Sequence, residues 1–259
     1  MRSEIISPAE SISLFVKDIL VLEDDARGKK NLPFFADGYP GIMFQQTANG
    51  LFVSPQNKKM PLFFLYGQTI HPIELIIDGS YSLICFQLYP FVLNSFFNLD
   101  AKDLNDDCYD LKQLSEFNAA RTIEDLDATV NIENIVMIIT AFLYKIFEAK
   151  REMLDYKIRQ AIELIINNNG STSITELIKT LNINERTFER RFTMQVGISP
   201  KQFSQIIKFQ SSLNQLTHKD YNNLTDVVYN NGYADQSHFI RVFKAFTGKT
   251  PKKFSAGNK

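Results

Sequence analysis

Two groups of polar side chains occupy matching places in a stretch that the chain repeats. The stretch FERRFTMQVGISPKQF begins at Phe188 and FIRVFKAFTGKTPKKF begins at Phe239, which places Arg190 and Arg241 opposite each other in the alignment. A guanidinium can form two parallel hydrogen bonds with the edge of a guanine or with a phosphate. The spacing therefore indicates two binding sites for a polyanion rather than one catalytic centre.

The residues beside each arginine complete the candidate contact set. In the first copy Phe188 and Phe192 lie one helical turn apart, and Phe239 and Phe243 do the same in the second. Such a stripe predicts an amphipathic helix whose opposite face is exposed. The candidate contact residues on that face are Arg186, Glu189, Arg190 and Thr193 in the first copy, and Gln236, Ser237, His238, Arg241 and Lys244 in the second.

Two neighbouring residues have alternative interpretations. His238 is as compatible with a core position as with a base or phosphate contact, because it stands at the start of its helix. Arg191 is better suited to a phosphate contact or a solvated position than to base reading. Ile240 is apolar where a polar contact would be expected, so the two copies are not equivalent on their outer face.

The ends of the repeated helices are marked by glycine and proline. Gly197 and Gly248 suit the left-handed residue that closes a helix. Ser199 with Pro200, and Thr250 with Pro251, supply an N-cap followed by proline at the first helical position. Each copy therefore predicts a helix that ends at the glycine and a new helix that begins directly afterwards.

Short amphipathic segments precede both copies. SITELIKTL and the turn NIN precede the first, and NLTDVVYNN and the turn GYA precede the second. A short helix, a tight turn and a second helix constitute a helix-turn-helix. We therefore predict two such units, joined by a helix from Pro200 to about Leu216 with an inward face made by Phe203, Ile206, Ile207 and Leu213.

The charge distribution favours a nucleic-acid partner for this region. Residues 157–259 hold 15 Lys and Arg against 7 Asp and Glu, while residues 1–156 hold 13 against 22. The chain as a whole has a formal charge of -1, so this basic segment is offset by an acidic remainder. A helical half that binds protein instead of DNA, in a ligand-sensing or scaffold protein, is the alternative. Only DNA binding would weaken steeply with salt.

The N-terminal half has the pattern of an antiparallel β domain. Short apolar runs with alternation, separated by turn signals such as DGYPG, NG and DGS, predict a small barrel or sandwich. A short helix is predicted at FVLNSFFNL and a longer one from Ile132 to Phe147. The predicted fold class is α+β, divided into a β-rich domain (1–112), a helical linker (113–155) and a double helix-turn-helix (156–259). The predicted strands lie in SISLFVKDILVL, GIMFQ, LFV, LFFLYG, IELII and SLICFQL.

These segments resemble a known family. GYADQSHFIRVFKAFTGKTPKKF and LNINERTFERRFTMQVGISPKQF are similar to the paired units of AraC/XylS-type bacterial transcriptional regulators. The resemblance implies a seven-helix DNA-binding domain whose two recognition helices enter successive major grooves, often in an activator. FADGYPGIMFQ, FLYGQTIHPIEL and SLICFQLYPFVLNSFFNLDAKDLND resemble the cupin-like domain found in a branch of this family, which can bind small ligands.

Enzyme chemistry is disfavoured by the residue types. His71 is the single histidine of the first 150 residues, so a metal-dependent cupin centre lacks ligands and a nucleophile lacks its base. Cys85 and Cys108 are too few for a zinc or disulfide framework, and a repair cysteine, as in some relatives, is the minor alternative. We expect no cofactor and no enzyme activity. The absence of a signal sequence and of long apolar runs favours a cytoplasmic protein without a membrane span.

Two further expectations concern assembly and sensing. The apolar stripe from Ile132 to Phe147 predicts a homodimer contact that includes Ile135, Ile139 and Phe142, with packing on the chain's own β domain as the equal alternative. Double-stranded DNA is the expected partner, and RNA polymerase and a small-molecule effector are further candidates. A barrel lined by Phe44, Phe63, Phe64, Ile76, Ile84 and Phe86 favours a filled core, with a small apolar effector pocket as the alternative.

Overall fold

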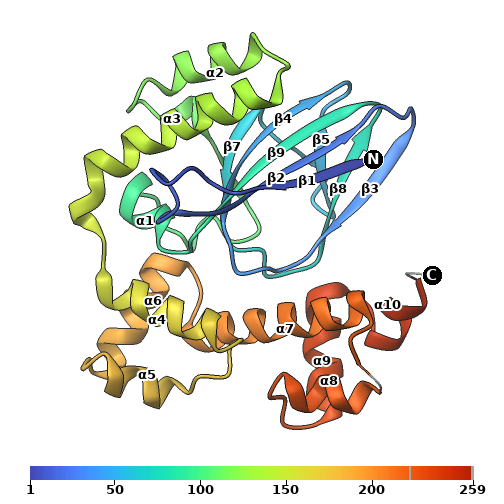
Figure 1. The fold of residues 1–259 in the computed structure, drawn as a ribbon, viewed down its shortest axis with the longest axis vertical. Helices are drawn as coiled ribbons and strands as arrows, with labels where there is room; N and C mark the ends of the chain where they lie inside the picture. Colours follow the sequence, from blue (N-terminus) through green and yellow to red (C-terminus); the bar gives the residue numbers. More distant parts are fainter. Residues whose placement is uncertain (222, 258–259) are drawn as a thin grey trace.

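The computed structural model describes residues 1–221 and 223–257. A β domain with covering helices forms the N-terminal half, and the C-terminal half is helical (Figure 1). This is the α+β class that the sequence predicts. The described strands are β1 (Arg2–Ile6), β2 (Val16–Asp24), β3 (Lys29–Phe34), β4 (Gly41–Thr47), β5 (Leu51–Ser54), β6 (Lys58–Lys59), β7 (Phe63–Tyr66), β8 (Ile73–Asp78), β9 (Tyr81–Leu88) and β10 (Cys108–Asp110).

Within the described residues, the strands form a two-sheet sandwich. One sheet has six strands in the order β1-β2-β9-β4-β7-β10, and the other has four in the order β3-β8-β5-β6. All the paired strands are antiparallel, with Ile42 opposite Phe86 and Met43 opposite Cys85 in the centre of the larger sheet. The sequence predicts a small barrel or a sandwich, and the structure has the sandwich.

Both faces of the larger sheet are buried. Along β9, Leu83 and Cys85 belong to the core between the two sheets, while Ile84 and Phe86 belong to the core shared with the helices. Because successive side chains of a strand point to opposite faces, this alternation requires a cover on each side. The helices that cover the second face are α1 (Val92–Phe97), α2 (Ala119–Asp127) and α3 (Ile132–Lys150).

Helix α3 lies over the β domain (Figure 1), and the apolar stripe of this helix is buried. Asn131 caps its first turn by accepting a hydrogen bond from the Asn134 backbone N–H. Ile135, Ile139 and Phe142 are at most 2% exposed, and the Phe142 ring lies 5.8 Å from the ring of Phe63. The prediction that these three residues contact a second subunit is wrong, because the β domain of the same chain already covers them.

The C-terminal half follows the predicted pattern of helices. Two 3-10 turns, Leu111–Gln113 and Arg151–Met153, precede it. Ser199 caps the long linking helix by accepting a hydrogen bond from Gln202 N at 3.2 Å, and Pro200 stands in its first turn. The described helices are α4 (Tyr156–Asn167), α5 (Ile174–Thr180), α6 (Glu185–Val196), α7 (Pro200–His218), α8 (Leu224–Asn230), α9 (Gln236–Thr247) and α10 (Pro251–Gly257).

The structure differs from the strand predictions at the N-terminus. Strands β1 and β3 were not expected, since β1 begins with charged residues and β3 contains Pro33. Both are sheet-edge strands, where polar residues and proline are tolerated. Residues 11–15 form a turn instead of the start of β2. Among the described residues, no helix is long and apolar enough to cross a membrane.

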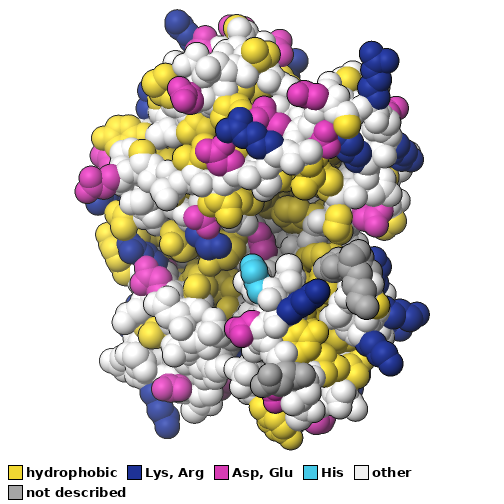
Figure 2. Space-filling view, turned by 45° about the vertical axis from the view of Figure 1, so that its right-hand side comes forward, with side chains coloured by type: hydrophobic (Ala, Val, Ile, Leu, Met, Phe, Trp, Pro, Cys, Tyr) yellow, Lys and Arg dark blue, Asp and Glu magenta, His cyan; other side chains and the backbone are white. Residues whose placement is uncertain are grey.

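The two halves share a continuous apolar core. Phe96 and Ile139 of the N-terminal half belong to the same buried cluster as Phe192 and Phe203 of the C-terminal half. The space-filling view shows hydrophobic side chains along the seam between the halves (Figure 2). Helix α1 packs directly on α6, so the β domain is in contact with the helical repeat itself.

Candidate nucleic-acid interface

The first helix-turn-helix consists of α5 and α6. The Asn184 side chain caps α6 by accepting a hydrogen bond from Thr187 N at 2.9 Å. Phe188 and Phe192 are fully buried beneath it, and Gly197 ends it with a φ of 85°. The short asparagine cap, the aromatic stripe and the left-handed glycine fix the direction of α6 and leave one face of it outward.

The outward face of α6 carries the first predicted contact set. Arg186, Glu189 and Arg190 are exposed, and Thr193 is half-buried at the edge. Glutamate accepts a hydrogen bond from cytosine N4, and arginine donates hydrogen bonds to guanine or to phosphate. This face therefore carries both an acceptor and donors for base edges.

The second helix-turn-helix repeats this construction with α8 and α9. Asn223 and Asp226 form a capping box at the start of α8. At the start of α9, Asp235 accepts a hydrogen bond from His238 N at 2.7 Å. Phe239 and Phe243 are fully buried, and Gly248 ends α9 with a φ of 71°.

The outward face of α9 carries the second predicted set. The exposed members are Gln236, Ser237, Arg241 and Lys244. His238 is half-buried, and its ring meets Tyr233 edge-on with ring centroids 5.7 Å apart. Ile240 is half-buried and packs against the core, which explains an apolar residue at that place.

Arg191 has a structural partner that the sequence did not reveal. Its Nε donates to Asp155 Oδ2 at 2.7 Å, and its guanidinium also forms an ion pair with that carboxylate. Asp155 in turn caps α4 by accepting from Ile158 N at 3.3 Å. The expected phosphate-contact or solvated role of Arg191 is therefore replaced by a tie between α6 and α4. The one signal in the sequence was an aspartate directly before Tyr156, where the predicted C-terminal domain begins.

Helix α7 connects the two units through a buried inner face. Phe203 and Ile206 are 0% exposed, and Ile207 and Leu213 are at most 9% exposed, as expected from their spacing. Lys208 Nζ donates to Gly232 O in the turn of the second unit at 2.9 Å, and burial lowers the pKa of this lysine. The connection is thus a single rigid helix with a polar tie to its second partner.

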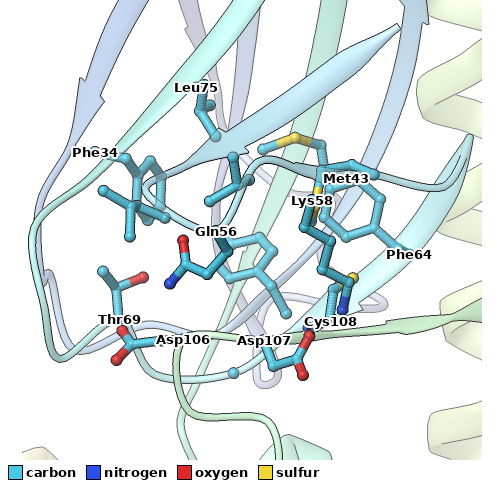
Figure 3. Close-up of a pocket in the computed structure, with 15 residues that line it drawn as sticks. Phe34, Met43, Gln56, Lys58, Phe64, Thr69, Leu75, Asp106, Asp107 and Cys108 are labelled. Carbon is cyan, nitrogen blue, oxygen red and sulfur yellow. Dashed lines mark hydrogen bonds and ion pairs between the residues drawn. The ribbon is translucent and has the colours of Figure 1, made fainter.

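A cavity of about 50 Å³ lies between the two sheets of the β domain (Figure 3). Of the residues predicted to line a pocket, Phe64 does so. The other predictions are wrong: Phe44, Phe63, Ile84 and Phe86 face the helices on the opposite side of the sheet, and Ile76 lies outside this lining. The apolar part of the wall consists of Phe34, Met43, Val53, Met60, Phe64, Tyr66, Ile73 and Leu75.

Polar residues gather on one side of this cavity. Lys58 Nζ forms an ion pair with Asp107, and Asp106 accepts hydrogen bonds from Ile70 N at 2.7 Å and from the backbone N–H of His71 at 3.1 Å. The Thr69 side chain is 5% exposed and forms no side-chain hydrogen bond within the described residues. The charged groups around the cavity are therefore already partnered, whereas the threonine hydroxyl is available.

The two cysteines lie close to the same cavity. Cys85 is buried with its Sγ 3.0 Å from the Tyr66 hydroxyl, and burial raises the pKa of its thiol to about 12. Cys108 is half-buried in the cavity wall, where burial also raises its pKa although Lys58 opposes the shift. Among residues 1–221 and 223–257, no cluster of three His, Cys, Asp or Glu side chains could hold a metal.

Comparison with known proteins identifies the two halves separately. Residues 177–257 match the model of a helix-turn-helix domain, and residues 4–110 match a domain of unknown function, DUF6597. An uncharacterized HTH-type transcriptional regulator of Staphylococcus aureus is 28% identical over 101 residues, which are 39% of this chain and 13% of that protein. The HTH-type transcriptional activator RhaS of Yersinia pestis is 27% identical over 89 residues, 34% of this chain and 32% of RhaS.

A solved structure has the same overall fold. An apo variant of ToxT from Vibrio cholerae superimposes with a TM-score of 0.50 at 14% identity, covering 93% of this chain and 98% of that one. The chain spans about 13% of the length of the Staphylococcus aureus regulator that it matches, and the shared part is the helical half that carries the paired helix-turn-helix units. Residues 177–257 are therefore a helix-turn-helix domain similar to those of HTH-type transcriptional regulators, and residues 4–110 are a DUF6597 domain.

Proposed function

We propose that this protein binds specific sites in double-stranded DNA by placing α6 and α9 in successive major grooves. The observation that carries the proposal is the equivalence of Arg190 and Arg241, which are exposed at the same place in two separately capped helices. Neither forms an ion pair with any residue in the described ranges, so both guanidinium groups are free to meet an acceptor on DNA.

The neighbouring side chains supply different kinds of contact. Arg186 and Glu189 flank Arg190 and suit base edges of opposite hydrogen-bonding character. Gln236 and Ser237, in the first turn of α9, can reach a base or a phosphate, and Lys244 suits a phosphate. Thr193 and His238 are half-buried, and we assign them to contacts at the margin of the interface.

Selection of binding sites from random DNA tests this function. The purified protein should enrich duplexes that contain two specified segments about 10 base pairs apart, one for each recognition helix. Affinity for the enriched duplex should fall steeply between low and moderate salt because several phosphates are contacted. Failure to enrich any sequence, with retention of a salt-insensitive protein partner instead, would favour the scaffold alternative.

We further propose that the cavity of the β domain accepts a small effector. An apolar wall with two polar side chains, Thr69 and Gln56, that form no hydrogen bond among the described residues matches the composition of small-molecule sites. Thermal-shift screening of small aromatic metabolites against the parent and Leu75→Trp, which fills the cavity, tests this. A ligand should raise the melting temperature of the parent and leave that of the variant unchanged.

The remaining assignments follow from this mode of action. We propose RNA polymerase as a partner at promoters and the cytoplasm as the site of action, and we retain a homodimer as the assembly. The division into a sensor domain (1–112), a helical linker (113–155) and a DNA-binding domain (156–259) is proposed on the same basis.

A further inference from the structure

The loop from Asp100 to Cys108 forms one wall of the β-domain cavity. Asp106, Asp107 and Cys108 all line it, and the loop is held there by hydrogen bonds. The Asp106 backbone N–H donates to Gln68 O at 2.9 Å, and its carboxylate accepts from Ile70 N at 2.7 Å. This end of the loop therefore belongs structurally to the sensor cavity.

The other end of the same loop contacts recognition helix α6. Asn105 Nδ2 donates to the carbonyl oxygen of Gly197, the residue that ends α6, at 2.8 Å. Ala101 is fully buried in this contact. Asn105 Oδ1 and Gln195 Oε1 are both buried without a hydrogen-bond partner among the described residues. Since an unsatisfied buried polar atom costs free energy, this contact is not at its energetic optimum and is open to rearrangement.

Two glycines allow the backbone of the Asp100–Cys108 loop to contact both the cavity wall and the end of α6 directly. A Cβ on Gly67, at the cavity, would lie 2.3 Å from the carbonyl oxygen of Leu104. A Cβ on Gly197, at α6, would lie 2.5 Å from the carbonyl oxygen of Ala101. Because no flexible side chain separates the loop from either neighbour, a shift of the cavity wall is passed on to the end of the recognition helix.

The β domain also contacts the second half of the repeat. Gln210 of α7 donates a side-chain hydrogen bond to Ala36 O, and Gly38 lies against Ile207. The Phe35 ring meets Phe254 of α10 with centroids 6.0 Å apart. The domain thus contacts both helix-turn-helix units while leaving the outer faces of α6 and α9 exposed.

The size of the cavity explains how a ligand would move the loop. A volume of about 50 Å³ holds about four water-sized groups, which is less than a substituted aromatic ring requires. The other walls are strands together with the turns that hold Gln56, Met60, Gly67 and Thr69, and among these walls the Asp100–Cys108 loop is the one hydrogen-bonded to the end of α6 in the described residues. The ligand class that fits is a small, uncharged aromatic molecule with one or two hydrogen-bonding groups, since Lys58 and Asp107 neutralise each other, and the side chains of Thr69 and Gln56 have no hydrogen-bond partner among the described residues.

We propose that the Asp100–Cys108 loop couples this cavity to recognition helix α6, so that an aromatic molecule filling the cavity displaces the loop and lowers DNA affinity. The proposal rests on the proposed DNA-binding function and adds the route and the direction of its regulation. It concerns a contact inside one chain and requires no second subunit.

A tethered probe tests the coupling without a known effector. In a Cys85→Ser background, the Cys108 thiolate attacks the sulfenyl sulfur of benzyl methanethiosulfonate, which forms a mixed disulfide and releases methanesulfinate. The benzyl group then occupies the cavity, and dithiothreitol removes it. Methyl methanethiosulfonate is the matched control, because its methylthio group fits the existing space. Hydrogen–deuterium exchange of residues 100–107 and 193–198 is read together with affinity for the selected DNA.

The expected result is faster exchange in both segments and a Kd raised by about fivefold or more after benzylation, with about a twofold change or less after methylthiolation. Reduction should restore the parent values. Unchanged exchange in residues 193–198, or unchanged DNA affinity despite faster exchange, would overturn the proposal. If the unmodified protein binds no DNA, the proposed function fails, while the exchange data still decide whether the loop and α6 are coupled.

Variants at the glycines give an independent check. Gly197→Ala should undock the loop and accelerate exchange in residues 100–105. Gly248→Ala is the matched control: it strains the same left-handed helix end in the second unit, but no atom lies within 4 Å of its added Cβ. Asn105→Ala should act in the same direction as Gly197→Ala without backbone strain. Equal exchange of the loop in all three variants would contradict the coupling.

Discussion

Arg191 and Asp155 tie the first recognition helix to the helix that opens the C-terminal half. Arg191 Nε lies 2.7 Å from Asp155 Oδ2, and the carboxylate is 13% exposed. The neighbouring Arg190 is exposed and has no such partner in the described parts of the chain. Two adjacent arginines therefore differ in their surroundings: Arg191 positions α6, and Arg190 is exposed where we propose that it contacts DNA.

This difference predicts that substitution of Arg191 lowers the stability of the protein, whereas substitution of the adjacent Arg190 does not. Asp155→Ala removes both the ion pair and the cap of α4, so it should lower the free energy of unfolding by roughly 1–3 kcal/mol. Arg191→Ala should have a similar effect, whereas Arg190→Ala should leave stability within about 0.5 kcal/mol of the parent. Urea unfolding followed by circular dichroism measures all three. A stable Arg191→Ala protein would show that the tie is unimportant.

The inner face of α3 should matter for stability and not for association. Ile139→Ala and Phe142→Ala each remove a buried side chain and should cost about 2–5 kcal/mol. Met137→Ala, on the exposed side of the same helix, is the control and should cost little. Sedimentation should give the same oligomeric state for all three folded variants. Selective dissociation of a dimer by the inner substitutions would restore the original expectation.

Asp37 should make stability depend on pH. Burial raises the pKa of this carboxyl to about 6, against hydrogen bonds from Tyr39 N and Gln87 Nε2 and the charge of Lys17, which lower it. An unfolded aspartate titrates near 3.8, so between these values the folded state holds the extra proton. The contribution of Asp37 to the free energy of unfolding therefore falls by up to about 3 kcal/mol as the pH rises from about 3.8 to about 6.

The test compares the parent with Asp37→Asn in unfolding experiments from pH 4 to pH 7. The parent should lose stability relative to the variant as pH rises to about 6, and the difference should level off above that value. Parallel curves would show that Asp37 does not titrate in this range.

The two thiols should react at different rates. Cys85 is buried with a pKa raised to about 12, while Cys108 is half-buried at the cavity. A thiol reagent should therefore label Cys108 first in the native protein and both residues after unfolding. Mass spectrometry of the labelled peptides distinguishes them. Labelling of Cys85 in the native state at a comparable rate would indicate that the sandwich opens readily.

Local signals located the C-terminal half well. The glycine ends, the Ser199–Pro200 start and the aromatic stripes are short-range features, and they placed α6, α7 and α9 within one or two residues of their observed bounds. The exposed positions of Arg190 and Arg241 followed from the same periodicity. Short-range signals were sufficient because helix ends and helix faces are determined within a few residues.

Long-range relationships escaped prediction. Phe63 and Phe64 are adjacent and both buried, so alternation could not tell which of them faces the cavity. The answer depends on helices that cover the other side of the sheet. Likewise, Asn105 meets Gly197 across 92 positions, and nothing in either local sequence marks the contact.

The binding of Arg190→Ala and Arg241→Ala to the selected duplex tests the central claim most directly. If α6 and α9 read successive major grooves, the two segments lie about 10 base pairs apart on one face of the DNA. Arg190→Ala should relax the preference in one segment and Arg241→Ala in the other, each with a loss of about 1–3 kcal/mol for a base contact. If both variants bind the selected site as tightly as the parent at moderate salt, the two-helix mechanism is contradicted.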